Sequence, residues 1–184
     1  MEQGTVYFFT GLAGAGKTTI GGLFYRRLLA RKPDAVLLDG DQLRNRNGTG
    51  RSAAASDAPI QDDSRYTTAA RKAGAWVLFA NCRDLAEQGH DVVCCSISMY
   101  REIREWNRAN IEHYKEIYIK VTRETLYRRD QKKLYSSGAR NVVGVDLPYD
   151  EPECPDIVIE NDSDETPEKI VERLETFLGK EGAL

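Results

Sequence analysis

Short apolar runs alternate along the chain with stretches whose apolar residues recur at helical spacing. The runs are rich in Val and Ile and apolar on both faces, which is typical of buried parallel strands. They predict strands at 6–10, 35–38, 92–97, 116–121 and 157–160. Between them, helices are predicted at about 17–31, 70–88, 101–110, 123–133 and 166–178. The alternation predicts an α/β fold in which helices cover both faces of a parallel sheet.

One region departs from this pattern. Residues 45–59 are small and polar and show no periodicity, so we expect a flexible surface insertion at about 45–62. No linker divides the 184 residues, which favours a single domain over 1–184. A second polar stretch, 160–165, predicts a solvated loop before the last helix.

Composition narrows the class of protein. The net charge is −3, so no nucleic-acid surface is expected. No apolar run approaches the length of a membrane span, and no membrane partner is expected. The four cysteines lack metal-ligand spacing. They indicate reduced thiols, one of the adjacent pair Cys94 and Cys95 being buried, and a cytoplasmic protein.

The most informative motif follows the first predicted strand. Residues 11–18 read GLAGAGKT, which fits the phosphate-binding pattern GxxxxGK[ST] at every fixed position and leads into a helical stretch. Lys17 can reach the β- and γ-phosphates, and Thr18 can ligate Mg²⁺. The expected contacts to a nucleoside triphosphate are Gly11, Ala13, Gly14, Ala15, Gly16, Lys17, Thr18 and Thr19. A turn that merely joins a strand to a helix is the alternative.

A second group of polar residues follows the second predicted strand. Asp39 and Asp41 fall at the carboxyl end of this strand, where open parallel sheets bind ligands. Either carboxylate could accept a proton from an attacking hydroxyl group or orient metal-bound water, and Arg44 could hold an anionic substrate. A simple turn with a helix cap is the alternative. The guanine-reading pattern [NT]KxD is absent, which favours a small-molecule kinase over a GTPase.

Five segments carry motifs in the order in which one family has them. They are 11–19 (GLAGAGKTT), 38–44 (LDGDQLR), 97–101 (ISMYR), 129–135 (RDQKKLY) and 144–152 (GVDLPYDEP). On these segments the chain resembles the adenylylsulfate (APS) kinases over about residues 5–160. The resemblance implies a P-loop kinase that uses ATP and Mg²⁺ to phosphorylate the ribose 3′-hydroxyl of APS. It also implies a homodimer, although the residues themselves leave the assembly open.

The resemblance assigns roles to further residues. The candidate catalytic residues become Lys17, Asp39, Asp41, Ser98 and Lys132. A substrate contact is expected of Ser98, since direct transfer needs no phosphorylated serine. The candidate substrate contacts are Asp41, Arg44, Tyr66, Arg71, Ile97, Ser98, Lys132 and Arg140. Arg129, Lys132 and Arg140 are expected on a lid at about 123–149, with Arg129 on ATP; a solvated helix face is the alternative.

The sequence departs from the family pattern on the acceptor side. Gly74 stands at an Asn position, Met99 at a Pro position, and Val142 where the family has a second ring that stacks on the substrate base. Tyr66 could still stack on one face of that base, and Arg71 could grip its phosphate or sulfate. Kinase chemistry is therefore better supported than APS as acceptor. The alternatives are a pyrimidine-linked, CDP-type acceptor and a non-catalytic nucleotide-binding subunit.

Overall fold

The structure, a computed structural model, describes residues 2–40, 67–130, 142–180 and 182. In chain order its elements are β1 (Val6–Thr10), α1 (Lys17–Leu29), β2 (Val36–Asp39), α3 (Thr68–Glu87), β3 (Val92–Cys95), α4 (Arg101–Asn110), β4 (Tyr114–Lys120), α5 (Arg123–Arg129), β5 (Ile157–Glu160) and α6 (Pro167–Lys180). The predicted insertion at 45–62 lies outside the described residues.

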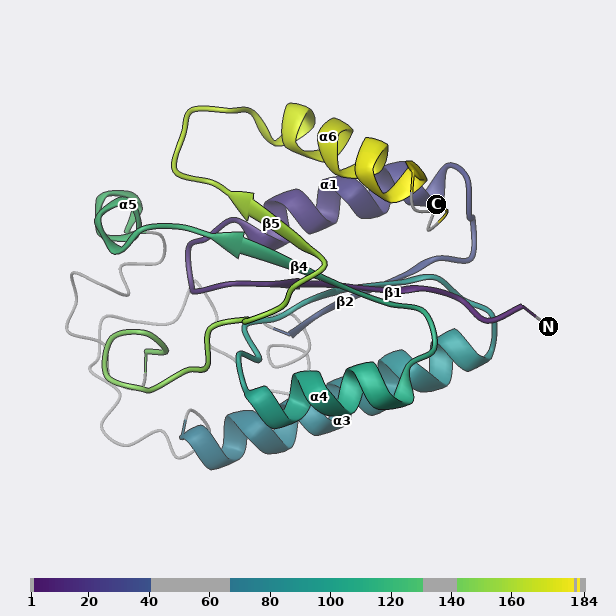
Figure 1. Cartoon of the computed structure of the whole chain (residues 1–184), viewed down its shortest axis with the longest axis horizontal. Coiled ribbons are helices and arrows are strands. Elements are labelled where there is room, and N and C mark those ends of the chain that lie inside the picture. The colour runs from purple at the N-terminus through teal and green to yellow at the C-terminus, as the bar shows by residue number, and fades with distance from the viewer. Residues whose placement is uncertain (1, 41–66, 131–141, 181, 183–184) are drawn as a thin grey trace, which may run out of the picture.

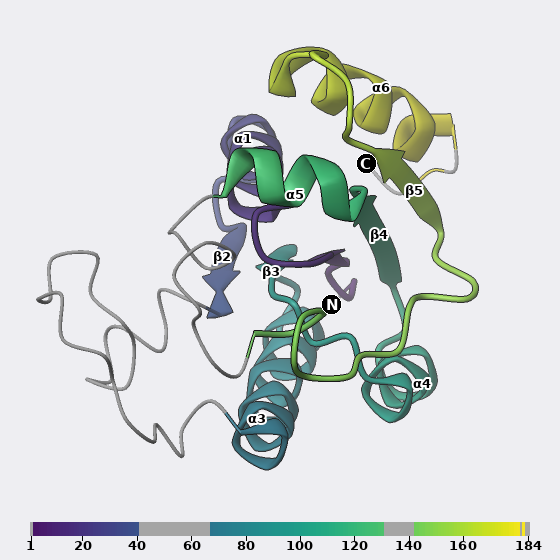
Figure 2. The ribbon, with the colours of Figure 1, turned by 90° about the vertical axis from the view of Figure 1, so that its left-hand side faces the viewer.

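The five strands form one parallel sheet in the order β2-β3-β1-β4-β5. Helices α1 and α6 cover one face of this sheet, and α3 and α4 cover the other (Figure 1). The predicted α/β architecture is therefore confirmed. The carboxyl ends of all five strands lie at one edge, which faces the viewer in Figure 2, and α5 lies across this edge. In open parallel sheets this edge is where ligands bind.

Several predicted boundaries are wrong for local reasons. Strand β3 ends at Cys95 rather than at 97, because the chain turns and Ser98 adopts a left-handed φ of 32°. Strand β4 begins at Tyr114, two residues before the prediction, because Tyr114 pairs with Val6 of β1. Helix α5 ends at Arg129, where Asp130 takes the left-handed conformation with a φ of 31°; the rest of the predicted helix lies outside the described residues.

The core has two layers, one on each face of β1. Tyr7 packs edge-on against Phe24 of α1, with ring centroids 5.0 Å apart. Phe8 points to the opposite face and packs edge-on against Phe79 of α3 at 4.8 Å. All five residues of β1 are buried, as expected for the central strand of a sheet that is covered on both sides. Each face thus carries its own apolar cluster and holds its helices in place.

The cysteines are free thiols in the structure. Cys82, Cys94 and Cys95 are buried, and Cys154 is exposed. Both members of the adjacent pair are therefore buried, whereas the sequence predicted this for one only, because each faces one of the two covered sides of β3. Burial raises the pKa of Cys95 to about 12. None of the helices in the described ranges combines the length and apolar character needed to cross a bilayer.

A buried ion network joins α4 to β4. The Glu116 side chain is only 2% exposed and lies 3.4 Å from Arg104 Nε and 3.0 Å from Arg108. Arg104 also donates hydrogen bonds to the carbonyl oxygens of Asp150 and Glu151, at 2.8 and 3.2 Å. Burial raises the pKa of Glu116, although the charges of both arginines oppose this shift. The network fixes the segment that follows the predicted lid against the body of the protein.

We expect Glu116→Gln to lower the free energy of unfolding by about 3–5 kcal/mol, because it leaves the buried Arg104 guanidinium without its charged partner. The matched control is Glu87→Gln, which removes the exposed i,i+4 pair between Glu87 and Arg83. Such surface pairs contribute less than about 0.5 kcal/mol. Urea denaturation followed by circular dichroism measures both. Equal effects of the two substitutions would contradict the account of the network.

Candidate active site

The phosphate-binding loop, residues 11–18, connects the carboxyl end of β1 to α1. A Cβ atom on Gly11 would lie 2.4 Å from the Ile119 carbonyl oxygen, so only glycine fits this approach to β4. Gly16 is the N-cap of α1 and has a left-handed φ of 105°. The loop therefore ends at the amino end of α1, where backbone N–H groups and the helix dipole attract anions. This geometry supports the predicted phosphate site.

Lys17 is the first residue of α1, and its ammonium group lies within the loop. Its Nζ donates a hydrogen bond of 2.8 Å to the carbonyl oxygen of Leu12. The first turn of α1 contains no acidic residue, so nothing there opposes the positive end of the helix dipole. The loop thus combines backbone N–H groups with one mobile positive charge.

Thr18 and Asp39 bring the ends of two separate strands together. Thr18 Oγ1 donates a hydrogen bond of 2.8 Å to Asp39 Oδ2, and Asp39 is buried at 5% exposure. Neighbouring oxygen ligands of an octahedral Mg²⁺ ion, each bonded at about 2.1 Å, lie about 3 Å apart. The two oxygen atoms therefore fit adjacent positions around one Mg²⁺. The sequence predicted Thr18 as a metal ligand and Asp39 as a general base or a residue that orients metal-bound water.

The carboxyl end of β3 lies beside Asp39. Ser96 Oγ and Ser98 Oγ are 2.8 Å apart, and both residues are buried. A Cβ atom on Gly40 would lie 3.1 Å from Ser96 Oγ, so the two strand ends are in contact. Ser98 therefore lies near Asp39, although it follows the strand by three residues. Ile97 is half-buried in the same turn.

The amino end of α3 brings further positive charge to this edge. Lys72 forms an ion pair with Glu102 at 2.5 Å and lies 5.2 Å from the ring centre of Tyr100, the N-cap of α4. Arg71, the residue predicted to grip the acceptor, is the half-buried neighbour of Lys72. The contact between the amino ends of α3 and α4 thus places Arg71 on the same side of the sheet as Ser98.

An apolar cluster joins the loop to the other elements at this edge. Its buried members are Leu12 of the loop, Met99 after β3, Tyr118 of β4, Leu126 of α5 and Val143. Helix α5 therefore packs directly over the phosphate-binding loop, with half-buried Arg129 at its end. This cluster places the start and the end of the predicted lid region on either side of the loop.

Some predicted site residues lie outside the described residues: Asp41, Arg44, Tyr66, Lys132 and Arg140. Their roles remain predictions. The three acceptor-side departures are all described, and Met99 is buried at 1% exposure. A Cβ atom on Gly74 would meet no atom within 4 Å, whereas Val142 is buried.

The structure also shows two residues whose importance the sequence did not reveal. The stretch 160–165 was expected to be solvated, yet Asn161 is buried and donates to the Ala15 carbonyl oxygen of the loop at 2.8 Å. Asp162 accepts hydrogen bonds from Thr122, the N-cap of α5. The expectation for Asn161 was wrong because its burial depends on the position of the loop, which no local pattern records.

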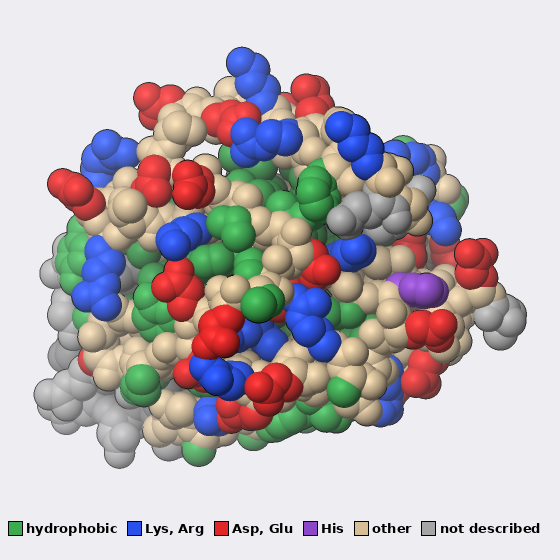
Figure 3. All heavy atoms as spheres, in the orientation of Figure 1, with side chains coloured by type: hydrophobic (Ala, Val, Ile, Leu, Met, Phe, Trp, Pro, Cys, Tyr) green, Lys and Arg blue, Asp and Glu red, His purple; other side chains and the backbone are tan. Residues whose placement is uncertain are grey.

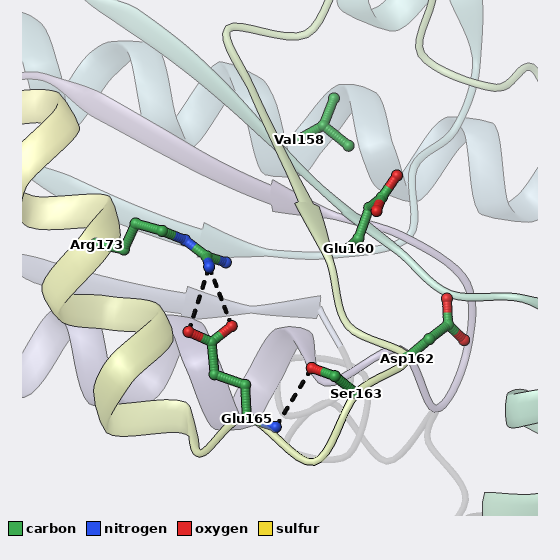
Figure 4. Close-up of a pocket in the computed structure, with 6 residues that line it drawn as sticks. All are labelled: Val158, Glu160, Asp162, Ser163, Glu165 and Arg173. Carbon is green, nitrogen blue, oxygen red and sulfur yellow. Dashed lines mark hydrogen bonds and ion pairs between the residues drawn. The ribbon is translucent and has the colours of Figure 1, made fainter.

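A surface groove lies beside β5 and α6. Figure 3 shows the surface hollowed near the connection between these two elements. The groove is lined by Val158, Glu160, Asp162, Ser163, Glu165 and Arg173. Arg173 pairs with Glu165 at 3.1 Å (Figure 4). The remaining carboxylates would repel a triphosphate, so the groove does not compete with the loop as a phosphate site. Among the described residues, no group of three or more metal-ligating side chains suggests another metal centre.

The parallel sheet, the phosphate-binding loop after its central strand and the Thr18–Asp39 pair define a P-loop kinase. A family model described as adenylylsulphate kinase matches residues 3–160. The chain belongs to this family, which confirms the resemblance inferred from the motifs.

Individual relatives support the family and differ in what they act on. The chain is 38% identical over 160 residues to the cytidine diphosphoramidate kinase of Campylobacter jejuni, with 85% of each chain covered. It is 32% identical over 167 residues to a probable adenylyl-sulfate kinase of Bacillus subtilis, covering 87% of this chain and 78% of that protein. The Mycobacterium tuberculosis APS kinase, solved with AMPPNP and APS, has a TM-score of 0.76 at 26% identity, with 97% and 99% covered.

We expect Lys17→Ala to lower kcat by about 10²–10³-fold, because it removes a positive charge that would stabilise the transferring phosphoryl group. Lys169→Ala, on the exposed surface of α6, is the matched control and should leave kcat unchanged. ADP release under saturating ATP, coupled to NADH oxidation, measures both variants. An unaltered kcat in Lys17→Ala would contradict the role assigned to this residue.

Proposed function

We propose that the protein uses Mg·ATP to phosphorylate the ribose 3′-hydroxyl group of an activated nucleotide. The observation that carries this proposal is the hydrogen bond between Thr18 and Asp39. It brings together two oxygen atoms, one from the phosphate-binding loop and one from the end of β2, that could both bind Mg²⁺. Ser98 and Arg71 lie along the same edge, where an acceptor would meet the γ-phosphate.

The chain supplies a residue for each part of the transfer. The acceptor oxygen attacks the γ-phosphorus, the bond from that phosphorus to the β–γ bridging oxygen breaks, and ADP leaves. Thr18 and Asp39 would hold Mg²⁺, which neutralises charge on the phosphates. Because Asp39 is then occupied at the metal, we assign the role of general base for the hydroxyl proton to Asp41. Lys17 would move from the Leu12 carbonyl to the phosphates.

Positive charges of the lid region complete the site in this proposal. Arg129, at the end of α5, would contact ATP, and Lys132 and Arg140 would close over the transferring group. Closure would exclude water and favour transfer to the acceptor over hydrolysis. Ser98 would contact the acceptor, since direct in-line transfer requires no phosphorylated serine.

For the acceptor, we place a cytidine diphosphate derivative ahead of adenylyl sulfate. The cytidine diphosphoramidate kinase of Campylobacter jejuni is 38% identical to this chain, whereas the probable adenylyl-sulfate kinase of Bacillus subtilis is 32% identical. Val142 and Gly74 support the same order. An aliphatic side chain replaces one stacking ring, which is worth about 1–3 kcal/mol per base, and a glycine removes an amide group. Both changes remove contacts that the family pattern offers to the acceptor nucleotide, which favours an acceptor other than adenylyl sulfate.

Adenylyl sulfate remains the second candidate because of the family itself. Tyr66 and Arg71 keep residue types that suit a stacked base and an anionic group. A homodimer and a cytoplasmic location remain predictions.

An acceptor screen tests the proposal. We expect ADP release with cytidine diphosphoramidate to exceed that with adenylyl sulfate by at least about tenfold in kcat/KM, and phosphorus NMR should show a new phosphomonoester on the ribose. The reverse order would restore adenylyl sulfate as the acceptor. Tight ATP binding without turnover of any nucleotide acceptor would instead indicate a non-catalytic subunit.

Gly74→Asn tests the acceptor side more sharply. The new side chain meets no atom within 4 Å at its Cβ, so we expect it to fold and to shift the preference toward adenylyl sulfate. Gly179→Asn is the matched control, because Gly179 is also helical, exposed and free of near neighbours at its Cβ position. If both variants, or neither, change the ratio of kcat/KM values, Gly74 does not read the acceptor.

A further inference from the structure

We infer that Asn161 and Asp162, at the end of β5, are positioning residues that set the phosphate-binding loop and helix α5 relative to each other. The inference rests on the proposed function, since these two elements would form opposite walls of the ATP site. Neither residue belongs to a sequence motif for phosphate binding. The two residues are adjacent in the chain, but Asn161 contacts the phosphate-binding loop and Asp162 contacts the amino end of α5.

Asn161 contacts the phosphate-binding loop from the end of β5. Its Nδ2 atom donates a buried hydrogen bond of 2.8 Å to the carbonyl oxygen of Ala15, across 146 residues of sequence. The same amide fills the space beside Gly16, where an added Cβ atom would lie 2.9 Å from Nδ2. The carbonyl of Ala15 thus points toward β5. Because the C=O and N–H of a trans peptide group point in opposite directions, the N–H of the same group points away from β5. This N–H belongs to Gly16, the N-cap of α1.

Asp162 holds the amino end of α5. Its carboxylate accepts hydrogen bonds from the backbone N–H of Thr122 at 3.0 Å and from Thr122 Oγ1 at 2.7 Å. Thr122 in turn caps α5 by accepting a hydrogen bond from the Thr125 N–H group. Partial burial raises the pKa of Asp162, but the hydrogen bonds from Thr122 and the charge of Arg129 outweigh it and hold this pKa below its usual value. Asp162 therefore fixes the amino end of α5.

The turn that carries these two residues is braced on both sides. The backbone N–H of Asn161 donates to the Lys120 carbonyl oxygen of β4 at 2.9 Å. Beyond Asp162, Glu165 pairs with Arg173 of α6, and its N–H donates to Ser163 Oγ at 3.3 Å. Figure 4 shows the Asp162 side chain pointing away from the Glu165–Arg173 pair. Because the turn is held on both sides, it can fix the positions of the phosphate-binding loop and of α5, which a solvated loop could not do.

Hydrogen–deuterium exchange on the whole protein, together with calorimetric titration of Mg·ATP, tests this role. In Asn161→Asp, a carboxylate oxygen replaces the donor and faces the Ala15 carbonyl. We expect amide exchange in residues 11–19 to rise about tenfold and the Kd for ATP to rise by a similar factor. In Asp162→Ala, the faster exchange should appear in residues 122–129 instead.

The matched control is Asn110→Asp. The Asn110 amide also donates to a backbone carbonyl at 2.8 Å, that of Trp106, but on the exposed end of α4. This variant should change neither the exchange of residues 11–19 nor the Kd for ATP. If Asn161→Asp does not fold, Asn161→Ala replaces it with the same expected results.

Three results would overturn the inference. They are unchanged exchange in the loop, faster exchange without weaker ATP binding, and a uniform rise across all peptides, which would indicate a general loss of stability. If the unmodified protein does not bind ATP, the proposed function fails. The exchange data alone then decide whether Asn161 and Asp162 hold the two elements.

Discussion

The approach of the phosphate-binding loop to the neighbouring strand ends constrains the rest of this structure. At Gly11 the loop passes so close to the Ile119 carbonyl that no side chain could be accommodated. At Ala15 it accepts a hydrogen bond from Asn161 of the β5 end. A phosphate site made of backbone N–H groups works only if these groups are held in place before the ligand arrives, because ordering them on binding would cost affinity. The contacts with the sheet edge hold the N–H groups of the loop in place before the ligand binds.

The same edge brings together groups that are distant in sequence. Strand β3 lies between β1 and β2, yet the loop extends far enough for Thr18 to reach Asp39. An apolar cluster then packs α5, the β3 end and the end of the lid region around Leu12. Behind it, the buried Glu116–Arg104 pair fixes the returning chain against α4. Each described residue of the proposed reaction thus lies on a helix or strand or directly beside one.

The sequence predicts the features that depend on neighbouring residues and misses those that depend on residues distant in the chain. The apolar runs predicted β1 and β5 residue for residue, although only β1 is buried throughout, whereas Val158 of the edge strand β5 is 50% exposed. The end of β3 was overestimated, since a left-handed Ser98 leaves no trace in residue type. The phosphate-binding loop was readable because its motif is local. The pairing of Thr18 with Asp39 depends on strand order, and the burial of Asn161 depends on the loop above it, so neither could be read from spacing.

A crystal structure with AMPPNP and Mn²⁺ tests the central claim most directly, because Mn²⁺ takes magnesium sites and scatters anomalously. The account predicts an anomalous peak at bonding distance from Thr18 Oγ1, on the side of Asp39, with the β- and γ-phosphates on the N–H groups of residues 14–18. A metal ion bound away from Thr18, or a triphosphate lying outside the loop, would contradict it.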